Sequence, residues 1–296
     1  MIGLERGIVR LRAYDTEWSE IGARYCTRIK EALGNLVNDV AHVGSTSIPG
    51  LCAKPIVDVA VGVQSFDQQI VERMALAGFT HRPSHDDVHN MLFVDVEGEL
   101  RRAHIHVVLY MGMEWRNYIN FRDYLRTFEH VRNEYAALKQ SLAATYPNDR
   151  EAYTASKSDF IKYTLRKAMV WSYLGKRIDA KVDRPIGYVH TKGDKTLIYP
   201  VNYGYIPGVL GGDGEELDVY YLGASEPLED FSGTVIAIVH RADDVEDKLV
   251  ACAEDTHFDA KEICRAIYFQ ERYYNTTIET LDGQILHISN GEKHGN

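Results

Sequence analysis

The chain has 296 residues, of which 45% are hydrophobic and 26% charged, and this composition excludes a disordered tail or a small disulfide-stapled peptide. Its net charge of −10 is unevenly distributed, because residues 1–172 carry 21 basic and 21 acidic side chains. The acidic C-terminal part would repel nucleic acid and anionic membranes unless its carboxylates first bind divalent cations. We therefore expect neither nucleic acid nor a membrane as a partner.

The four cysteines form no CxxC pair and lack zinc-type spacing, which predicts reduced thiols and a cytoplasmic protein. The first residues show no apolar segment with a cleavage site, and no apolar run approaches the roughly 20 residues of a membrane helix. We expect neither secretion nor membrane insertion. The sequence is compatible with a homo-oligomer and does not specify one.

The first part of the chain alternates helical and strand patterns. From Asp15, apolar residues recur with helical spacing up to Gly34, which predicts an amphipathic helix that ends at a glycine. We expect these elements to form an α+β domain over residues 1–175. The other predicted elements are a strand at 40–43, a strand at 55–61, a helix at 66–77, a hairpin at 91–109 and two long helices at about 114–144 and 150–174.

The pattern changes near 175–178, where we place a domain boundary. Residues 176–296 contain short β-rich segments separated by glycine and proline, which is typical of a small β-barrel or sandwich. A last helix at about 259–274 would cover one face. The candidate strands are 178–182, 196–199, 217–222, 234–240 and 248–252.

Two acidic clusters in the C-terminal domain are candidate metal sites. Asp213, Glu215 and Asp218 lie on and just after a glycine-rich turn, and a second group spans 243–247 after an apolar strand. Carboxylates at neighbouring strand ends can hold hard cations such as Mg²⁺, which lower the pKa of bound water and neutralise phosphate. Each cluster alone also fits a solvated acidic loop.

Donors for phosphate oxygens are present in the segment Tyr199–Tyr205, at Lys248 and at 272–274. The string Tyr-Pro-x-Asn-Tyr-Gly-Tyr-Ile, followed by Asp-Gly-x-x-x-Asp, resembles the family I soluble inorganic pyrophosphatases over about 181–276. That family folds as a β-barrel, here expected to be OB-like, which holds several Mg²⁺ ions at aspartates and hydrolyses pyrophosphate.

The resemblance implies a role for each matching residue. Glu215 occupies the position of an aspartate linked to the attacking water, and Asp218 is the second catalytic residue. The implied metal ligands are Asp213, Asp218 and Asp243 with Glu246 or Asp247, and the implied phosphate contacts are Tyr203, Lys248 and Tyr273. Tyr199 and Arg272 are further candidate phosphate donors by their residue type and position. The implied substrate is pyrophosphate or another phosphoanhydride.

Several cations of the family pattern are missing. The family's Lys and Glu ahead of the Tyr-Pro motif have no clear counterpart, the expected Arg is absent, and Tyr274 replaces a phosphate-binding lysine. Two hypotheses follow. The domain is either a hydrolase of pyrophosphate or a related phosphoanhydride, or a catalytically degenerate regulatory protein that binds nucleotide or phosphate.

The N-terminal domain carries a second specific string, His42-Val-Gly-Ser-Thr-Ser-Ile-Pro-Gly-Leu-x-Ala-Lys-Pro-Ile-Val-Asp58. Together with segments at 102–107, 121–125 and 157–161, it resembles the GrpB family over about 8–170, which is grouped with the nucleotidyltransferase fold. The resemblance implies that the Gly-Ser turn starts a helix whose N–H groups hold a phosphate. The implied ligand is a nucleotide or another phosphorylated molecule.

A polymerase-like site would need a second carboxylate where this chain has Ala60, and His104 and His106 stand where a third is expected. The two histidines share one face of a strand by the period-2 rule. One interpretation is a mixed Asp/His metal or phosphate site with Lys157 as a further anion contact, and the other is a set of hydrogen-bonded core histidines. The candidate ligand residues are Gly44, Ser45, Lys54, Asp58, His104 and His106.

Overall fold

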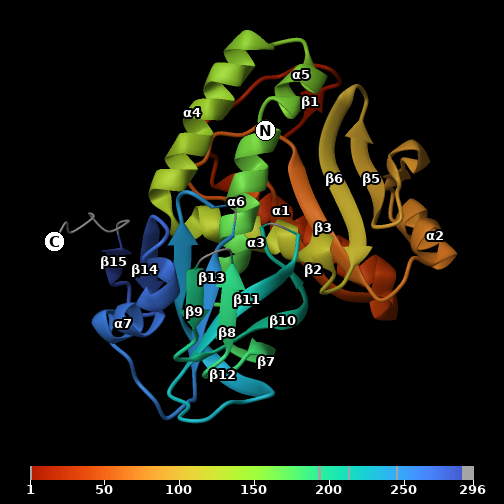
Figure 1. Ribbon diagram of the computed structural model, residues 1–296. Helices are drawn as coiled ribbons and strands as arrows, with labels where there is room; N and C mark the ends of the chain where they lie inside the picture. Colours follow the sequence, from red (N-terminus) through yellow and green to blue (C-terminus); the bar gives the residue numbers. More distant parts are fainter. Residues whose placement is uncertain (1, 193–194, 213, 245, 289–296) are drawn as a thin grey trace. The chain divides into compact units, whose positions relative to one another are not determined.

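A computed structural model describes residues 2–192, 195–212, 214–244 and 246–288 (Figure 1). The chain divides into two compact units, Met1–Ala168 and Met169–Asn296, and each has its own sheet and apolar core. This division falls inside the helix Ser158–Trp171, and the predicted boundary near 175–178 lies a few residues after that helix ends. In the described part of the chain, no helix is both long and apolar enough to span a bilayer.

The N-terminal unit is built on a mostly antiparallel sheet with the strand order β2-β3-β6-β5-β4, and β1 also pairs with β6. Strands β3 and β6 run parallel, while β5 and β6 form the predicted hairpin around Gly98, whose φ is 58°. The strands are β1 Leu4–Glu5, β2 Val37–Val43, β3 Val57–Val63, β4 Thr80–His81, β5 Asn90–Glu97 and β6 Leu100–Leu109.

Six α-helices accompany this sheet, and two predicted long helices are each divided. The helix predicted at 114–144 breaks at Phe128, an extended residue whose ring lies 4.4 Å from that of Tyr124. One extended residue barely disturbs the apolar periodicity, so the pattern concealed the break. The helices are α1 Glu17–Leu33, α2 Gln68–Leu76, α3 Met113–Thr127, α4 Glu129–Thr145, α5 Arg150–Ala155 and α6 Ser158–Trp171, with 3-10 turns at Gly34–Leu36, Ser45–Ser47 and Pro83–His85.

Alternation along β3 assigns its residues to two faces. Val57, Val59, Val61 and Val63 pack into the same apolar core as residues of α1 and α2. The residues between them face the other side, where Ala60 packs with Trp115 of α3. Because His104 lies opposite Asp58 in the register of β6 with β3, this second face also carries the polar residues of the candidate ligand site.

The C-terminal unit is a closed five-stranded barrel, as predicted. Its strands follow the order β13-β11-β10-β7-β12, and pairing of β12 with β13 closes the ring. Strands β14 and β15 extend from β12, β8 and β9 form a separate hairpin, and α7 packs against β14 and β15. The elements are β7 Arg177–Arg184, β8 Val189–Lys192, β9 Lys195–Ile198, β10 Asn202–Leu210, β11 Glu216–Leu222, β12 Asp230–Arg241, β13 Lys248–Cys252, α7 Ala260–Glu271, β14 Thr276–Thr280 and β15 Ile285–Ile288.

Strand β10 was not among the predicted strands, because two glycines and a proline interrupt its pattern. Gly204 is required there, since a Cβ at this position would lie 1.7 Å from the carbonyl oxygen of Lys181 on β7. The glycine therefore permits close pairing of two barrel strands and does not mark a loop.

Candidate functional site

The barrel contains a polar pocket of about 670 Å³. Its wall comes from the barrel strands, from the hairpin β8–β9 and from the end of α7. The pocket gathers most of the predicted phosphate contacts and both predicted catalytic residues. Those that line it are Tyr199, Tyr203, Glu215, Asp218, Lys248 and Tyr273, and the predicted metal ligand Glu246 lies in the same wall.

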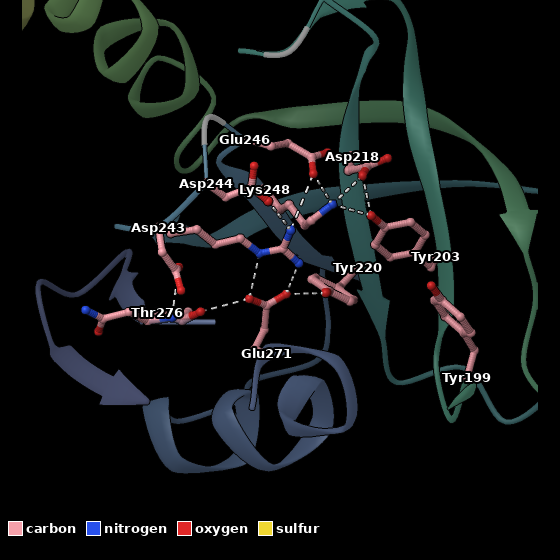
Figure 2. Close-up of polar contacts among 12 residues, drawn as sticks. Tyr199, Tyr203, Asp218, Tyr220, Asp243, Asp244, Glu246, Lys248, Glu271 and Thr276 are labelled. Atoms are coloured by element: carbon pink, nitrogen blue, oxygen red, sulfur yellow. Dashed lines mark hydrogen bonds and ion pairs between the residues drawn. The ribbon is translucent and has the colours of Figure 1, made fainter. Parts of the chain in front are cut away.

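Lys248 is the centre of a charged cluster in this pocket (Figure 2). Its side chain is 2% exposed, and its ammonium group donates to the Tyr203 hydroxyl, to Asp218 and, at 2.8 Å, to Glu246. Burial and a hydrogen bond with Asp218 raise the pKa of Glu246 to about 8. Burial opposes ionisation of Asp218 as well, but hydrogen bonding to Glu246 and the charge of Lys248 lower its pKa. The ammonium group of Lys248 therefore brings two carboxyl groups and a phenol into contact with a single cation.

A second cation, Arg241 at the end of β12, lies beside this cluster. Its guanidinium forms a bidentate pair with Glu271, with N–O distances of 3.0 and 2.6 Å, and its Nη1 atom also contacts Asp244 at 3.1 Å and Glu246 at 3.4 Å. Glu271 is fully buried and accepts further hydrogen bonds from Tyr220 and Thr276 (Figure 2). This network fixes Arg241 at the wall of the pocket.

Arg241 is a pocket residue that was not among the predicted site residues. Its guanidinium lies 3.7 Å from the ring centroid of Tyr274, the residue that replaces a phosphate-binding lysine of the family pattern. Its sequence signal was an arginine that follows the apolar run Val235–Val239 and stands two residues before the second acidic group. Such a position is also common for a surface charge.

Arg184 supplies another cation to the pocket. Its Nη1 atom donates to the Tyr199 hydroxyl at 2.7 Å, and its guanidinium lies 5.1 Å from the ring centroid of Tyr203. Burial raises the pKa of the neighbouring Asp183, which also lines the pocket. Two arginines thus stand in a pocket where the family pattern indicated missing cations.

Other predicted residues lie outside the pocket wall. Asp243 accepts a hydrogen bond from the backbone N–H of Asn275 at 2.9 Å, and Asp247 lies 3.4 Å from the ring of His240. Arg272 is exposed and donates to the Tyr273 hydroxyl at 2.9 Å. Asp213 lies outside the described residues. Within the described ranges, no group of three or more His, Cys, Asp or Glu side chains is arranged to hold a metal ion.

The N-terminal unit has its own pocket, of about 470 Å³. All six candidate ligand residues line it, and so does Lys157, which precedes α6. The remaining wall is largely apolar and aromatic. It is formed by Ile56, Tyr118, Phe121, Tyr135, Tyr153, Ile161 and Leu165, with Glu114, Asn117, Lys139, Arg150 and Thr154 as further polar residues.

Asp58 is held by the two histidines of β6. The Nδ1 atom of His104 lies 3.0 Å from its Oδ1 atom, and the Nε2 atom of His106 lies 4.0 Å from the same oxygen. Burial opposes ionisation of Asp58, but the hydrogen bond from His104 and the charges of both histidines lower its pKa. Burial lowers the pKa of His106 to about 4.

The Gly44–Ser45 turn differs from the prediction. It leads into a 3-10 turn of three residues rather than an α-helix, so there is no helix N-terminus to hold a phosphate. Gly44 has a φ of 66°, and a Cβ there would lie 2.4 Å from the Oδ2 atom of Asp58. The turn is therefore built to approach the Asp58 carboxylate closely, and Ser45 enters the pocket wall beside it.

Lys139 of α4 is a pocket residue that the sequence analysis missed. Its side chain is 2% exposed, and its ammonium group donates to the carbonyl of Cys52 and, at 3.1 Å, to Ser45 Oγ. Burial lowers its pKa to about 7. Its only sequence signal was its position four residues after Tyr135, on the buried stripe of α4.

Comparisons with known proteins divide the chain in two. The GrpB protein family model matches residues 8–167, and the inorganic pyrophosphatase family model matches residues 159–276. The chain is 35% identical over 173 residues to the glutamate-rich protein GrpB of Alkalihalophilus pseudofirmus, a match that covers 56% of this chain and 99% of that protein. The crystal structure of GrpB from Enterococcus faecalis is similar with a TM-score of 0.51 and 25% identity, over 55% of this chain and 99% of that one.

An inorganic pyrophosphatase from Neisseria gonorrhoeae is similar at 22% identity with a TM-score of 0.27, over 33% of this chain and 74% of that one. The family model and the closed strand order confirm the expected pyrophosphatase-like barrel. The match to the first family model spans more than half of the residues. The chain therefore belongs to the GrpB family, with a pyrophosphatase-like barrel after its GrpB domain.

Proposed function

We propose that the C-terminal unit hydrolyses a phosphoanhydride, most simply inorganic pyrophosphate, with Mg²⁺ as its cofactor. The observation that supports this is the meeting of Asp218, Glu246 and Lys248 in the pocket of a pyrophosphatase-like barrel. Hydrolysis of a phosphoanhydride requires fixed donors for the phosphate oxygens and carboxylates for cations and water. This pocket contains both kinds of group.

The oxygen donors of the pocket fit a hard divalent cation. Asp218 and Glu246 lie in hydrogen-bond contact, and Glu215 lines the same wall. Mg²⁺ is usually bound through one or two carboxylates and completed by water and substrate phosphates, so a cage of three protein ligands is not needed. When bound, Mg²⁺ would neutralise phosphate charge and act as a Lewis acid. Asp218 and Glu246 would hold it, with Asp213 as a further proposed ligand.

The cations of the pocket would bind the phosphate oxygens. Lys248, Arg241 and Arg184 each present N–H donors at the pocket wall, beside the phenols of Tyr199 and Tyr203. Charge-assisted hydrogen bonds from such groups are the strongest phosphate contacts available to a protein. The two arginines would replace the cations absent from the family pattern, and Glu215 with Asp218 would orient the attacking water.

The test is phosphate release from pyrophosphate by the full chain in Mg²⁺, beside a panel of nucleoside triphosphates. We expect Asp218→Asn to lower kcat by at least about 100-fold, because it removes a charge that contacts Lys248 and Tyr203. Asp230→Asn is the matched control, since Asp230 forms an exposed pair with Lys181 on the outside of the barrel. Failure to release phosphate from every substrate of the panel would exclude the hydrolase.

The N-terminal unit is proposed to bind a nucleotide or another phosphorylated ligand, which the lysine-lined pocket beside Ser45 supports. Transfer of a nucleotidyl group would release pyrophosphate, and its hydrolysis by the barrel would make the transfer irreversible. We therefore propose that the two units serve one reaction sequence. Incubation with nucleoside triphosphates tests this, because the link requires pyrophosphate formation in an Asp218→Asn variant and its absence would exclude transfer from these substrates.

The alternative is a regulatory protein in which both sites bind without turnover. Ala60, in place of a second carboxylate on β3, favours this for the N-terminal unit. Mg²⁺-dependent binding of pyrophosphate or nucleotide without any product would distinguish it from the hydrolase. The four cysteines are free thiols, which supports a cytoplasmic location in either case, and light scattering would determine whether the chain forms a homo-oligomer.

A further inference from the structure

The N-terminal pocket contains an excess of positive charge. Its described wall includes four lysine or arginine side chains but only two carboxylates, Asp58 and Glu114. Asp58 is already paired with His104. Among the described residues, no carboxylate lies within ion-pair distance of Lys54, Lys139 or Lys157. The three ammonium groups therefore share a cavity in which no described carboxylate pairs with them directly, although the charge of Asp58 acts on all three.

Neutral groups surround these lysines instead. The ammonium groups of Lys54 and Lys157 lie 5.3 and 4.7 Å from the ring centroid of Tyr153, on which both converge. Lys139 lies 4.7 Å from the ring centroid of Tyr135 and donates to Ser45 Oγ. Faces of aromatic rings attract cations but only partly offset the loss of hydration. The arrangement is costly to the empty protein and favourable to one that holds an anion.

The size of the cavity and its apolar wall indicate which kind of molecule carries the anionic group. A bare inorganic ion would leave most of this 470 Å³ cavity unfilled, and the cavity lies in the range of about 300–1,000 Å³ typical of small-molecule sites. Tyr118 and Phe121 of α3 and Ile161 and Leu165 of α6 form an apolar surface in the same cavity. A ligand with an anionic end and a flat or apolar body matches both parts.

We propose that the N-terminal unit binds an organic phosphate monoester, with Lys54, Lys139, Lys157 and Ser45 around the phosphate and the apolar wall around its organic part. Three ammonium groups match a doubly charged oxyanion better than a single carboxylate. This inference rests on the proposed binding of a phosphorylated ligand, and it specifies the charge of the ligand and the residues that contact its phosphate.

The electrostatics of the lysines provide an independent readout. Burial lowers the pKa of Lys139 to about 7 and, together with the charge of Lys157, that of Lys54 to about 8. Binding of a dianion would raise both pKa values, so the complex would take up protons at pH 8. The other titratable or charged groups that face the lysines are Asp58, Glu114, Cys52, Arg101, Arg150, His104, His106, Tyr118, Tyr135 and Tyr153.

Calorimetric titration of the full chain with phenyl phosphate tests the proposal, with benzoate and inorganic sulfate as comparison probes. We expect phenyl phosphate to bind most tightly, and Lys157→Met and Lys54→Met each to weaken it at least tenfold. Lys162→Met, at an exposed position on α6, should leave this binding unchanged. Thermal unfolding of each variant confirms that it is folded.

Proton uptake is measured by repeating the titration at pH 8 in two buffers of different ionisation enthalpy. Phenyl phosphate is already a dianion at this pH, so uptake of protons would come from the protein. We expect uptake in the unmodified chain and less in Lys139→Met. Phenyl phosphate bound equally well by the lysine variants would overturn the residue assignment while leaving ligand binding intact. If no phosphorylated probe binds, both this inference and the proposed N-terminal function are wrong, whereas tighter binding of benzoate would overturn the phosphate alone.

Discussion

The two pockets differ in what surrounds their buried cations. In the barrel, Arg241 and Lys248 are each in contact with at least two carboxylates, and Glu271 and Asp218 accept several hydrogen bonds apiece. In the N-terminal unit, Lys54, Lys139 and Lys157 face aromatic rings, a hydroxyl and a carbonyl. The buried cations Arg241 and Lys248 of the barrel therefore have carboxylate partners, and the three lysines of the N-terminal pocket have none among the described residues.

This difference indicates two kinds of binding. A balanced network holds its donors in fixed positions before a substrate arrives, which is the arrangement that electrostatic catalysis requires. Burial lowers the pKa of lysines that lack a carboxylate partner, and part of that free energy is regained when an anion enters. We therefore expect catalysis in the barrel to depend on the exact positions of its donors, and binding in the N-terminal pocket to depend on the charge of the ligand.

The largest expected effect comes from Glu271→Gln, which removes the carboxylate partner of a buried cation in the barrel. This change leaves the buried guanidinium of Arg241 without its bidentate partner, and removal of one member of a buried pair typically costs about 3–5 kcal/mol. We expect that loss in the free energy of unfolding of the C-terminal unit, measured by urea denaturation and by hydrogen exchange in its strands.

Glu254→Gln is the matched control for this prediction. Glu254 pairs with Arg177, but both side chains are about 60% exposed, so the change should cost less than about 1 kcal/mol. Equal losses in the two variants would show that the Glu271–Arg241 pair is no more important than a surface pair.

A smaller effect is expected from pH on the N-terminal unit. Lys139 has a pKa of about 7 in the folded protein, whereas an unfolded lysine titrates near 10.4, so between these values the unfolded chain binds more protons. Stability should therefore rise with pH, by about 2 kcal/mol between pH 7.5 and 9 from Lys139 alone. Tyr118, Tyr135 and Tyr153 have raised pKa values and stay protonated over this range.

Urea denaturation at the two pH values, followed by hydrogen exchange in the strands of each unit, measures this rise. Lys139→Met should reduce this rise, because methionine has a similar shape and no proton to lose, while Lys54, with a pKa of about 8, keeps a smaller rise in place. The barrel should show a smaller dependence of opposite sign, since Glu246 has a pKa of about 8 in the folded protein and stays partly protonated where an unfolded carboxyl group is ionised. A stability that falls with pH in the N-terminal unit, or that rises equally in Lys139→Met, would contradict the origin assigned to it.

The sequence predicted local features better than breaks and long-range partners. The hairpin at 91–109 follows from the glycine turn between its two strand patterns, and the strand at 248–252 follows from a short apolar run. The split at Phe128 and the strand around Gly204 depend on contacts with distant elements, which periodicity does not contain.

The candidate sites show the same limit. Ser45, Asp58 and Asp218 could be predicted as site residues because each belongs to a short contiguous motif. Lys139 and Arg241 are single charged residues on an apolar helix stripe and at a strand end, and only folding brings them to a pocket. Both are cations, so the sequence underestimated the positive charge of each site.

The smallest expected effect separates two glycines of the N-terminal unit, Gly44 and Gly98. Both have positive φ angles, so alanine is strained at either position, typically by about 1–2 kcal/mol. Only at Gly44 would the added Cβ meet another group, the Asp58 carboxylate at 2.4 Å, while nothing lies within 4 Å at Gly98. We expect Gly44→Ala to cost on the order of 1 kcal/mol more in urea denaturation, and to weaken phenyl phosphate binding where Gly98→Ala does not. Equal losses of stability with unchanged binding would mean that Asp58 can move away from the turn, and the N-terminal pocket would then be less rigid than its hydrogen bonds indicate.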